Sequence, residues 1–414
     1  MDRYDLLIVG GGINGAAIAR DAAIRGAKLL LVEKDDLAGH TSSASSKLIH
    51  GGLRYLERYE FRLVREALKE REILLRTAPH IVRPLRFVLP HARGMRPLWM
   101  IRGGLFLYDL LSFRGGLPRS SGVSRRDQSV RSALSAPGRL LSYWDAAVDD
   151  SRLVVLNAVQ AAEHGAEIAT RTELLAASRS EGVWRATLSG GRTAEASALV
   201  NAAGPWVEEV LGRSGAEAPG RLRLVRGSHI AVPALWEGDH AYILQQPDGR
   251  VVFALPYRGG LTVIGTTDVP VETGEEPRID AEETRYLCDA ADRYFRREVK
   301  PSDVVWSWSG VRALYDDGAA EAQAVTRDWH LELDEGGGAK LLSVFGGKLT
   351  TARALAQQVL DRLGVEGRRS TGWMALPGGD LTPAFLAWLE EVGEWMPQPL
   401  SPASPTPTAR GCAT

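Results

Sequence analysis

The strongest constraint on the fold is a strand–turn–helix–strand pattern at the start of the chain. Residues 4–9 form an apolar, β-branched run that leads into three consecutive glycines, and residues 13–25 follow with apolar residues at helical spacing. A second short apolar run, residues 28–32, ends at Glu33. Short, continuously apolar strands joined by a helix are typical of a parallel sheet that is buried on both faces. The sequence therefore predicts a βαβ unit here.

Glycines in this turn have the spacing of a dinucleotide-binding motif, Gly10-x-Gly12-x-x-Gly15. Gly10 permits the tight turn, Gly12 lets the backbone approach a pyrophosphate, and Gly15 allows the helix to pack closely on the strand. The helix start would present unpaired N–H groups and a positive dipole end to the phosphates. Glu33 would accept hydrogen bonds from a ribose hydroxyl and repel a 2′-phosphate, which argues against NADP. The alternative is an ordinary glycine turn with a surface glutamate.

The glycine motif alone does not distinguish FAD from NAD, and three later segments favour a flavin. Residues 41–47 carry small hydroxyls that suit a pyrophosphate or a flavin edge, although a solvated Ser/Thr loop has the same composition. Residues 201–206 end a predicted strand in small residues, and residues 346–351 open a late helix that would stabilise negative charge on a reduced flavin. The predicted FAD contacts are Gly10, Gly12, Ile13, Asn14, Gly15, Glu33, Lys34, Thr41, Ser42, Ser45, Ser46, Lys47, Ala203, Gly204, Trp206, Gly346, Gly347, Leu349 and Thr350.

Composition and charge exclude several other classes of protein. Lys plus Arg, 50 residues, nearly balance Asp plus Glu, 51 residues, so no overall positive field favours nucleic acid. The two cysteines, Cys288 and Cys412, are too few for a disulfide framework or a cysteine-based metal site, and we predict no metal. The N-terminus lacks the pattern of a signal peptide, and no apolar run is long enough to span a membrane. These features indicate a cytoplasmic protein.

A length of 414 residues favours two packed domains. After the βαβ unit we expect helices at 54–77, 151–164, 280–297 and 348–363, a β-meander at 167–203, strands across 221–269 and a strand at 341–345. From residue 397 the chain is rich in Pro, Ser, Thr and Ala, and we expect this tail to be disordered.

Residues 41–57, TSSASSKLIHGGLRYLE, strongly resemble the aerobic, FAD-dependent glycerol-3-phosphate dehydrogenases. The resemblance continues in the same order through VDDSRLV, NAAGPWV, RGSHI, IGTTDV, WSGVRALYDD, AVTRDW and SVFGGKLTTARALA, and covers roughly residues 4–378. It implies oxidation of sn-glycerol 3-phosphate to dihydroxyacetone phosphate by hydride transfer to N5 of a non-covalently bound FAD, with electrons passed to a membrane quinone. It also implies an α/β fold in which a Rossmann-like FAD-binding domain is interleaved with an antiparallel-sheet substrate domain, as in the amino-acid oxidases.

The resemblance also implies a division of the chain. The FAD-binding domain takes residues 1–80, 145–212 and 335–370, the substrate domain takes 81–144 and 213–334, and 371–396 form a remnant of the helical C-terminal region that family members usually carry, before the tail at 397–414. The sequence departs from the family pattern at Arg226, Tyr257 and Ala313, which stand where relatives have Lys, Trp and Pro.

A basic pocket for the substrate is implied by the same motifs. They place His50, Arg54 and Tyr55 in the substrate-side loop, and Arg312, Arg327 and Lys348 in the pocket. Arginine suits bidentate contacts with a phosphate dianion, and lysine suits a point-charge contact. A base near the C2 hydroxyl would aid proton removal, and we favour His50, with Lys348 or an arginine-held water as alternatives. Tyr55 would donate a hydrogen bond to the substrate or pack against the flavin.

Residues 83–131 carry ten arginines and only two acidic residues, and they enclose an apolar segment at 97–108. This composition suits an anionic membrane surface, with Trp99, Phe106 and Tyr108 at the level of the headgroups. The alternative is a buried helix flanked by solvated arginines. With the implied quinone, we expect peripheral attachment to the inner face of the cell membrane, and we also consider a homodimer.

Two other functions stay open at this point. An FAD amine or amino-acid oxidase would share the fold, although the motifs HGGLRY and SGVRALYDD argue against it. A truncated, non-catalytic flavin-binding protein would share the cofactor site.

Overall fold

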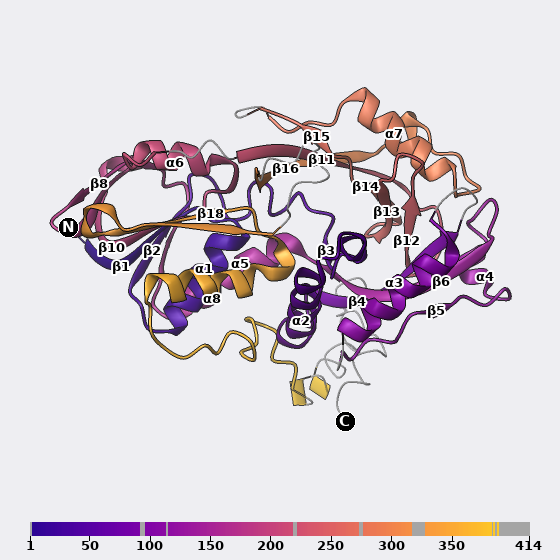
Figure 1. Cartoon of the computed structure of the whole chain (residues 1–414), viewed down its shortest axis with the longest axis horizontal. Coiled ribbons are helices and arrows are strands. Elements are labelled where there is room, and N and C mark those ends of the chain that lie inside the picture. The colour runs from indigo at the N-terminus through magenta and orange to yellow at the C-terminus, as the bar shows by residue number, and fades with distance from the viewer. Residues whose placement is uncertain are drawn as a thin grey trace.

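The computed structural model of the protein describes residues 2–91, 96–112, 115–217, 222–272, 276–316, 328–382, 384–385 and 387–388. Two large sheets make up the two halves of the molecule, the first at the left and the second at the right of Figure 1. Helices cover both sheets, so each half has its own hydrophobic core.

The first sheet has eight strands, six of them in the order β17-β18-β10-β1-β2-β7. Its parallel strands are β1 (Asp2–Val9), β2 (Leu29–Val32), β7 (Glu167–Ala169), β10 (Thr193–Asn201) and β18 (Lys340–Phe345). Antiparallel partners are added by β8 (Leu174–Ser180), β9 (Val183–Leu188) and β17 (His330–Asp334).

The predicted βαβ unit is confirmed by β1, α1 (Ile13–Ile24) and β2. Helix α1 is rich in alanine and packs between α5 (Asp150–Glu163) and α8 (Ala352–Leu363), the three helices that lie under the sheet in Figure 1. The opposite face of the sheet packs against α6 (Val207–Arg213) and the β8–β9 ribbon. Both faces of the central strands are therefore buried, which explains why their sequences lack alternation.

The second sheet has ten strands in a mostly antiparallel arrangement, with β12 and β4 as a parallel pair. Its order is β15-β11-β14-β13-β12-β4-β6-β3, with β16 paired to β11 and β5 paired to β6. The bounds are β3 (Leu48–Ile49), β4 (Val82–His91), β5 (Ser121–Gly122), β6 (Arg139–Val148), β11 (Leu222–Pro233), β12 (Ala241–Gln245), β13 (Val251–Tyr257), β14 (Leu261–Gly265), β15 (Val269–Pro270) and β16 (Trp306–Tyr315). Helices α3 (Leu98–Leu111), α4 (Gln128–Arg131) and α7 (Ala281–Asp292) lie against this half.

The chain crosses repeatedly between the two halves. Strand β3 belongs to the second sheet although residues 1–80 were assigned to the FAD-binding domain, and β17 belongs to the first sheet although it lies within residues 213–334. The domain boundaries stay a prediction, and these two strands are places where sheet membership departs from them.

Two expected helices are interrupted. The helix predicted at 54–77 is a 3₁₀ helix η1 (Leu53–Arg58) followed by α2 (Phe61–Thr77), because Tyr59 adopts a left-handed backbone with φ 59°. The helix predicted at 348–363 begins with a 3₁₀ turn, η6 (Leu349–Thr351), before α8. Further 3₁₀ turns are η2 (Ser189–Gly191), η3 (Gly204–Trp206), η4 (Pro301–Asp303) and η5 (Gly336–Gly338). The predicted meander at 167–203 is present as β7 to β10.

Helix α3 has two different faces, and one of them corrects a prediction. Trp99 and Phe106 are exposed, 73% and 70% respectively, as expected of residues at a membrane surface. Tyr108, which we expected beside them, is only 2% exposed and points into the core. A helix advances 100° per residue, so Tyr108 lies well round the helix from Phe106. Among the described residues no helix is long and apolar enough to cross a membrane.

A buried ion pair joins α2 to α8. The Glu70 carboxylate is 1% exposed and accepts two hydrogen bonds from Arg353, the Nε bond being 2.7 Å long. Because α8 packs on the first sheet and α2 packs near the second, this pair fixes one half of the molecule against the other.

We therefore predict that Arg353→Met lowers the free energy of unfolding by about 3–5 kcal/mol, because the mutation leaves a buried carboxylate without its partner. Urea unfolding of the cofactor-free protein measures the change. The double variant Glu70→Gln/Arg353→Met should recover much of the loss, and an Arg353→Met protein as stable as the wild type would contradict the prediction.

Candidate cofactor and substrate site

A cavity of about 370 Å³ lies where the parallel strands of the first sheet end and the second sheet begins. It is lined by Val9 and Val32 at the carboxyl ends of β1 and β2, by Ala202 after β10 and by Gly346 after β18. Ligands of open α/β sheets bind at such carboxyl ends. All the residues predicted to contact FAD line this cavity except Gly15 and Lys47.

The glycine turn is closed by backbone contacts that exclude side chains. Gly10 has φ 111°, and a Cβ there would lie 2.5 Å from the carbonyl oxygen of Ala202. A Cβ on Gly15 would lie 1.9 Å from the carbonyl oxygen of Gly10. Gly15 therefore lies beneath the turn and brings α1 against β1, which is the packing role expected of it. Gly12 faces the cavity directly.

The start of α1 is joined to a segment from the far end of the chain. Asn14 Nδ2 donates to the carbonyl oxygen of Gly346 at 3.0 Å, and the next residue, Gly347, has φ 97°. Asn14 Oδ1 is buried and has no hydrogen-bond partner among the described residues. Ser42 Oγ accepts from the backbone N–H of Ile13 at 3.0 Å, so this hydroxyl caps the helix from the loop above it. The arrangement offers polar groups to a ligand at the helix N-terminus.

Glu33 directly follows β2 and lines the first cavity. It is 8% exposed, and its two carboxylate oxygens accept hydrogen bonds from the backbone N–H groups of Gly11, at 2.6 Å, and Asp35, at 2.9 Å. Each oxygen keeps a further lone pair for a ribose hydroxyl. Lys34 lies over the Trp206 ring, 3.7 Å from its centroid, so these two predicted contacts form one cation–π pair at the cavity wall.

The hydroxyl-rich loop 41–47 is held by both halves of the protein. Thr41 Oγ1 donates to the carbonyl oxygen of Val311 at 2.7 Å, and Ser46 Oγ lies 2.8 Å from His229 Nε2. Ser45 Oγ donates to Asp150 at 2.7 Å.

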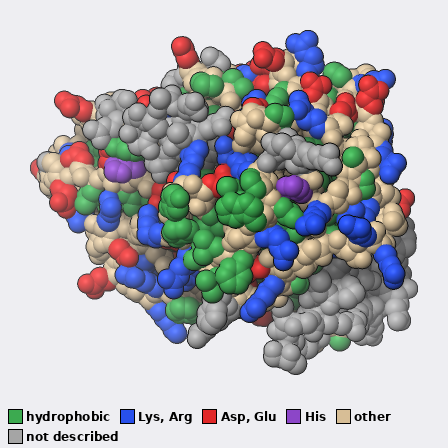
Figure 2. Space-filling model, turned by 45° about the vertical axis from the view of Figure 1, so that its right-hand side comes forward, with side chains coloured by type: hydrophobic (Ala, Val, Ile, Leu, Met, Phe, Trp, Pro, Cys, Tyr) green, Lys and Arg blue, Asp and Glu red, His purple; other side chains and the backbone are tan. Residues whose placement is uncertain are grey.

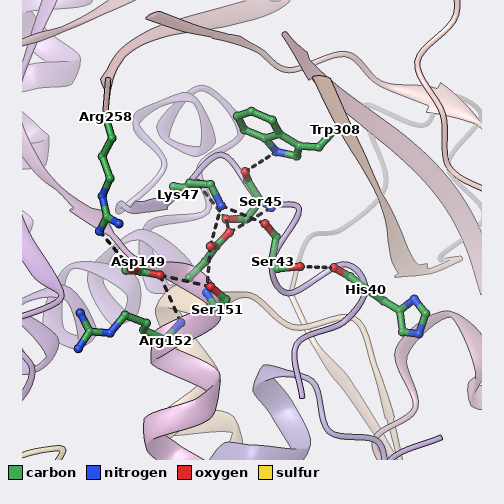
Figure 3. A network of polar contacts seen from close by, with 10 residues as sticks. His40, Ser43, Ser45, Lys47, Asp149, Ser151, Arg152, Arg258 and Trp308 are labelled. Atoms are coloured by element: carbon green, nitrogen blue, oxygen red, sulfur yellow. Dashed lines mark hydrogen bonds and ion pairs between the residues drawn. The ribbon is translucent and has the colours of Figure 1, made fainter. Parts of the chain in front are cut away.

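Lys47 does not reach the cavity, contrary to our expectation. Its ammonium group turns away and binds Asp150 Oδ1 at 2.7 Å. It also donates to the carbonyl oxygen of Ser43 at 3.0 Å, and Figure 3 shows Lys47 and Ser43 close together in the loop. Asp150 begins α5, where an aspartate is favourable beside the helix N-terminus, and its carboxylate is almost fully buried. The charge of Lys47 therefore compensates a buried carboxylate and organises the loop from behind.

A second cavity, of about 620 Å³, adjoins the first. His50, Tyr55, Phe253 and Thr266 line both cavities, so these side chains form a common wall. The second cavity is otherwise mostly apolar, with side chains from η1, α3, β12 and β13.

The predicted substrate residues gather around this common wall. Lys348 lies 4.2 Å from the centre of the Tyr55 ring and lines the first cavity, whereas Arg54 lines the second. Arg312 lines the first cavity and donates to Asp268 Oδ1 at 2.5 Å and to Thr266 Oγ1 at 3.1 Å. Arg327 lies outside the described residues.

His229 is a cavity residue that our sequence reasoning noted in RGSHI but did not select. It stacks on Trp308 with 5.2 Å between ring centres, and its side chain is 2% exposed. Burial, together with the nearby charges of Arg312 and Lys47, lowers the pKa of its imidazole to about 3. His229 is therefore neutral, and its role is to hold Ser46 at the cavity wall. The burial that lowers the pKa of His229 comes from strands that are distant in sequence, so no local sequence pattern indicated it.

Comparison with known proteins identifies the family. A model of the FAD-dependent oxidoreductase family matches residues 5–353. The chain belongs to the FAD-dependent oxidoreductases. A D-erythritol 1-phosphate dehydrogenase from Brucella abortus is 49% identical over 412 residues, covering 96% of this chain and 82% of that protein. A glycerol-3-phosphate dehydrogenase from Pseudomonas aeruginosa is 51% identical over 413 residues, covering 96% of this chain and 80% of that protein.

A solved structure supports the same family assignment for this oxidoreductase. The glycerol-3-phosphate dehydrogenase of Bacillus halodurans, complexed with FAD, is 28% identical and has a TM-score of 0.69, covering 95% of this chain and 72% of that chain. The predicted family resemblance and fold class are thus confirmed, and FAD is the cofactor. The site itself fits FAD, because Gly12 leaves room for a pyrophosphate and Asn14 presents an unpaired buried oxygen.

We predict that this oxidoreductase loses stability in acid partly through His229. The unfolded chain protonates this histidine below about pH 6.5, whereas the folded chain keeps it neutral down to about pH 3. The contribution of His229 to the free energy of unfolding is therefore complete above pH 6.5 and is lost as the pH falls, by about 2 kcal/mol between pH 7 and pH 5.

Unfolding free energies of the wild type and His229→Gln at both pH values measure this contribution. The variant should lose about 2 kcal/mol less than the wild type over that interval. Its remaining acid sensitivity would come from other buried groups such as His240, whose pKa burial lowers to about 4. Equal pH dependence in the two proteins would show that His229 is not held neutral.

Proposed function

We propose that this oxidoreductase converts sn-glycerol 3-phosphate to dihydroxyacetone phosphate. The observation that carries the proposal is that cationic side chains lie next to the wall shared by the two cavities. Lys348 and Arg312 line the first cavity and contact Tyr55 and Thr266 of that wall, and Arg54 lines the second cavity. A small phosphate ester needs such convergent charge, since its dianion is strongly hydrated in water. The names of the relatives at about half identity agree with this substrate class.

We assign the cofactor contacts by their position along the first cavity. Glu33 would hold the ribose, Gly12 and the start of α1 would hold the pyrophosphate, and residues 346–350 would hold the flavin end. FAD supplies the hydride acceptor when it is bound. The helix start after Gly347 would offer positive potential to the flavin end of the cofactor.

The residues of the chain would bind and orient the substrate. Arg312 would contact the phosphate, and Asp268 and Thr266 would hold its guanidinium group in place for that contact. Lys348 lies over the Tyr55 ring and lines the same cavity as Arg312. Arg327 remains assigned to this pocket by sequence alone.

His50 is our candidate for the group that accepts the hydroxyl proton. It lies in the common wall, and its backbone N–H is 3.4 Å from Thr350 Oγ1, beside the proposed flavin segment. A base in this position would typically contribute about 10²–10⁴-fold to the rate. The deeply buried His229 is a weaker candidate, because a group with a pKa of about 3 holds a proton poorly at neutral pH.

D-Erythritol 1-phosphate is a second candidate substrate, since a relative of 49% identity is named for it. The space beyond the common wall, about 620 Å³, gives room for a fourth carbon. We favour the three-carbon ester because the motifs of the sequence resemble the glycerol-3-phosphate dehydrogenases and a relative of 51% identity is named for that substrate.

We further propose that electrons leave to a quinone at an anionic membrane surface. On α3, Trp99, Phe106 and Leu110 follow one another at positions i, i+7 and i+11, so they share a face, and all are more than half exposed. Met100 of the same helix and Phe61 line the second cavity and are partly exposed, which connects this face to the site. Figure 2 shows hydrophobic side chains gathered beside Lys and Arg on one side of the molecule. A homodimer stays a prediction.

We predict that anaerobic addition of sn-glycerol 3-phosphate bleaches the bound flavin, and that Arg312→Ala raises the Michaelis constant by about 10- to 100-fold while FAD is retained. Flavin absorbance measures the bleaching, and steady-state kinetics with an artificial electron acceptor measure the Michaelis constant. D-Erythritol 1-phosphate, glycine and sarcosine are the comparison substrates.

Faster reduction by the four-carbon ester would favour the second candidate, and reduction by glycine or sarcosine would favour an amine oxidase. A yellow protein that none of these compounds bleaches would favour a non-catalytic flavin protein. An unchanged Michaelis constant would remove Arg312 from the phosphate pocket.

We predict that Trp99→Ser/Phe106→Ser weakens binding to vesicles containing phosphatidylglycerol by about tenfold or more, because interfacial binding scales with buried apolar area. Vesicle sedimentation measures the partition. Leu175→Ser is the matched control, since this side chain is 47% exposed on β8, at the opposite end of the molecule from α3. An equal loss of vesicle binding in the α3 variant and in Leu175→Ser, or no loss in the α3 variant, would refute α3 as the membrane contact.

A further inference from the structure

The hydroxyl group of Tyr108 lies directly beneath the loop that carries the proposed substrate residues. It accepts a hydrogen bond from the backbone N–H of Gly51 at 2.9 Å. It also donates to the Asp145 carboxylate and lies 2.8 Å from both of its oxygens. Tyr108 is 2% exposed and Asp145 is 1% exposed, so water does not compete for these contacts. One buried hydroxyl thus connects the core of the second half to the loop.

The loop has no spare room above this hydroxyl. A Cβ on Gly51 would lie 2.6 Å from Tyr108 Oη and 2.7 Å from a methyl carbon of Leu68. Gly52 has φ 75°, and a Cβ there would lie 2.2 Å from the Tyr55 ring. The two glycines therefore let the backbone rest on Tyr108 and turn sharply into η1. His50 precedes this pair and Tyr55 follows it, so both depend on where Gly51 is held.

Arg71 fixes the direction of the hydrogen bonds that the Tyr108 hydroxyl makes. Its Nη1 donates to Asp145 Oδ1 at 2.7 Å, and its Nη2 donates to Ser112 Oγ at 2.7 Å and to Glu72. Burial lowers the pKa of Arg71, but the charges of Asp145 and Glu72, the nearby Tyr108 and the hydrogen bond to Asp145 together outweigh it and raise the pKa, so the guanidinium group stays charged. Burial also raises the pKa of Tyr108 well above its usual range, so the phenol keeps its proton. That proton goes to the carboxylate, which leaves a lone pair for Gly51 N–H.

We propose that Tyr108 is a positioning residue for the reaction: through Gly51 it sets the placement of His50 and Tyr55 in the wall shared by the two cavities. Tyr108 lines neither cavity, and it acts only through the loop. The catalytic part of this proposal rests on the proposed function, since it takes the wall as the substrate contact. Displacement of reacting groups by about 1 Å is enough to slow an enzyme severely.

Tyr108→Phe tests the proposal, because it removes only the hydroxyl and keeps the ring. We expect flavin reduction at saturating sn-glycerol 3-phosphate to slow by about tenfold or more, with FAD affinity unchanged. Hydrogen exchange of the segment 48–56 should become faster at Gly51, whose N–H loses Tyr108 as its acceptor and keeps only its weaker interaction with Asp145. Asp145→Asn should show the same pattern, since it removes the charge that orients the hydroxyl.

Tyr242→Phe is the matched control. Its hydroxyl is also buried and donates to the carbonyl oxygen of Val130 at 2.5 Å, but it belongs to a different core cluster. Exchange and flavin reduction should keep their wild-type values in this variant. Unchanged exchange at Gly51 in Tyr108→Phe would overturn the proposal, and so would an equal slowing of flavin reduction in Tyr108→Phe and Tyr242→Phe. The exchange measurement uses no substrate. It therefore tests the hydrogen bond between Gly51 and Tyr108 even if sn-glycerol 3-phosphate fails to reduce the flavin of the wild type.

Discussion

The direct contact of backbone on backbone at the first turn is the constraint on which the site depends. Gly15 packs against the carbonyl oxygen of Gly10, and Gly10 packs against the backbone of Ala202, so α1, β1 and the end of β10 meet with only the Ala202 methyl group beside them. This contact brings the helix N-terminus to the carboxyl ends of the strands. The cofactor site is the space left beside that contact, and its polar groups come from the helix start and from Glu33.

The second half of the protein completes the site by fixing loops that start in the first half. Thr41 is held by β16, Ser46 by His229 of β11, and Gly51 by Tyr108 of α3. In each case a short polar side chain or a backbone group receives its position from a residue that is distant in sequence. The loop 41–52 therefore has little freedom of its own, as a site that must orient a small substrate requires.

The parts of the molecule that the sequence predicted well are those with local patterns. The βαβ unit, the meander at 167–203 and the cavity residues of the glycine turn all follow from spacing within a few dozen residues. Lys47 was misplaced because its partner, Asp150, is 103 positions away and no pattern links them. Tyr108 was misplaced because α3 is apolar on several faces, so composition does not tell which aromatic side chain faces inward. The break at Tyr59 follows from its left-handed backbone, with φ 59°, and the helical spacing of the surrounding residues gave no sign of it.

The hydrogen bond between Asn14 and Gly346 spans 332 positions of the chain, and this has a consequence for biogenesis. During synthesis the glycine turn leaves the ribosome first, and the segment that closes the other side of the cavity follows 332 positions later. Contacts of such high sequence separation form slowly and cannot form on a nascent chain that lacks one partner. Flavin loading must then follow the synthesis of this later segment, so a cellular shortage of flavin would act only on chains that already contain both partners.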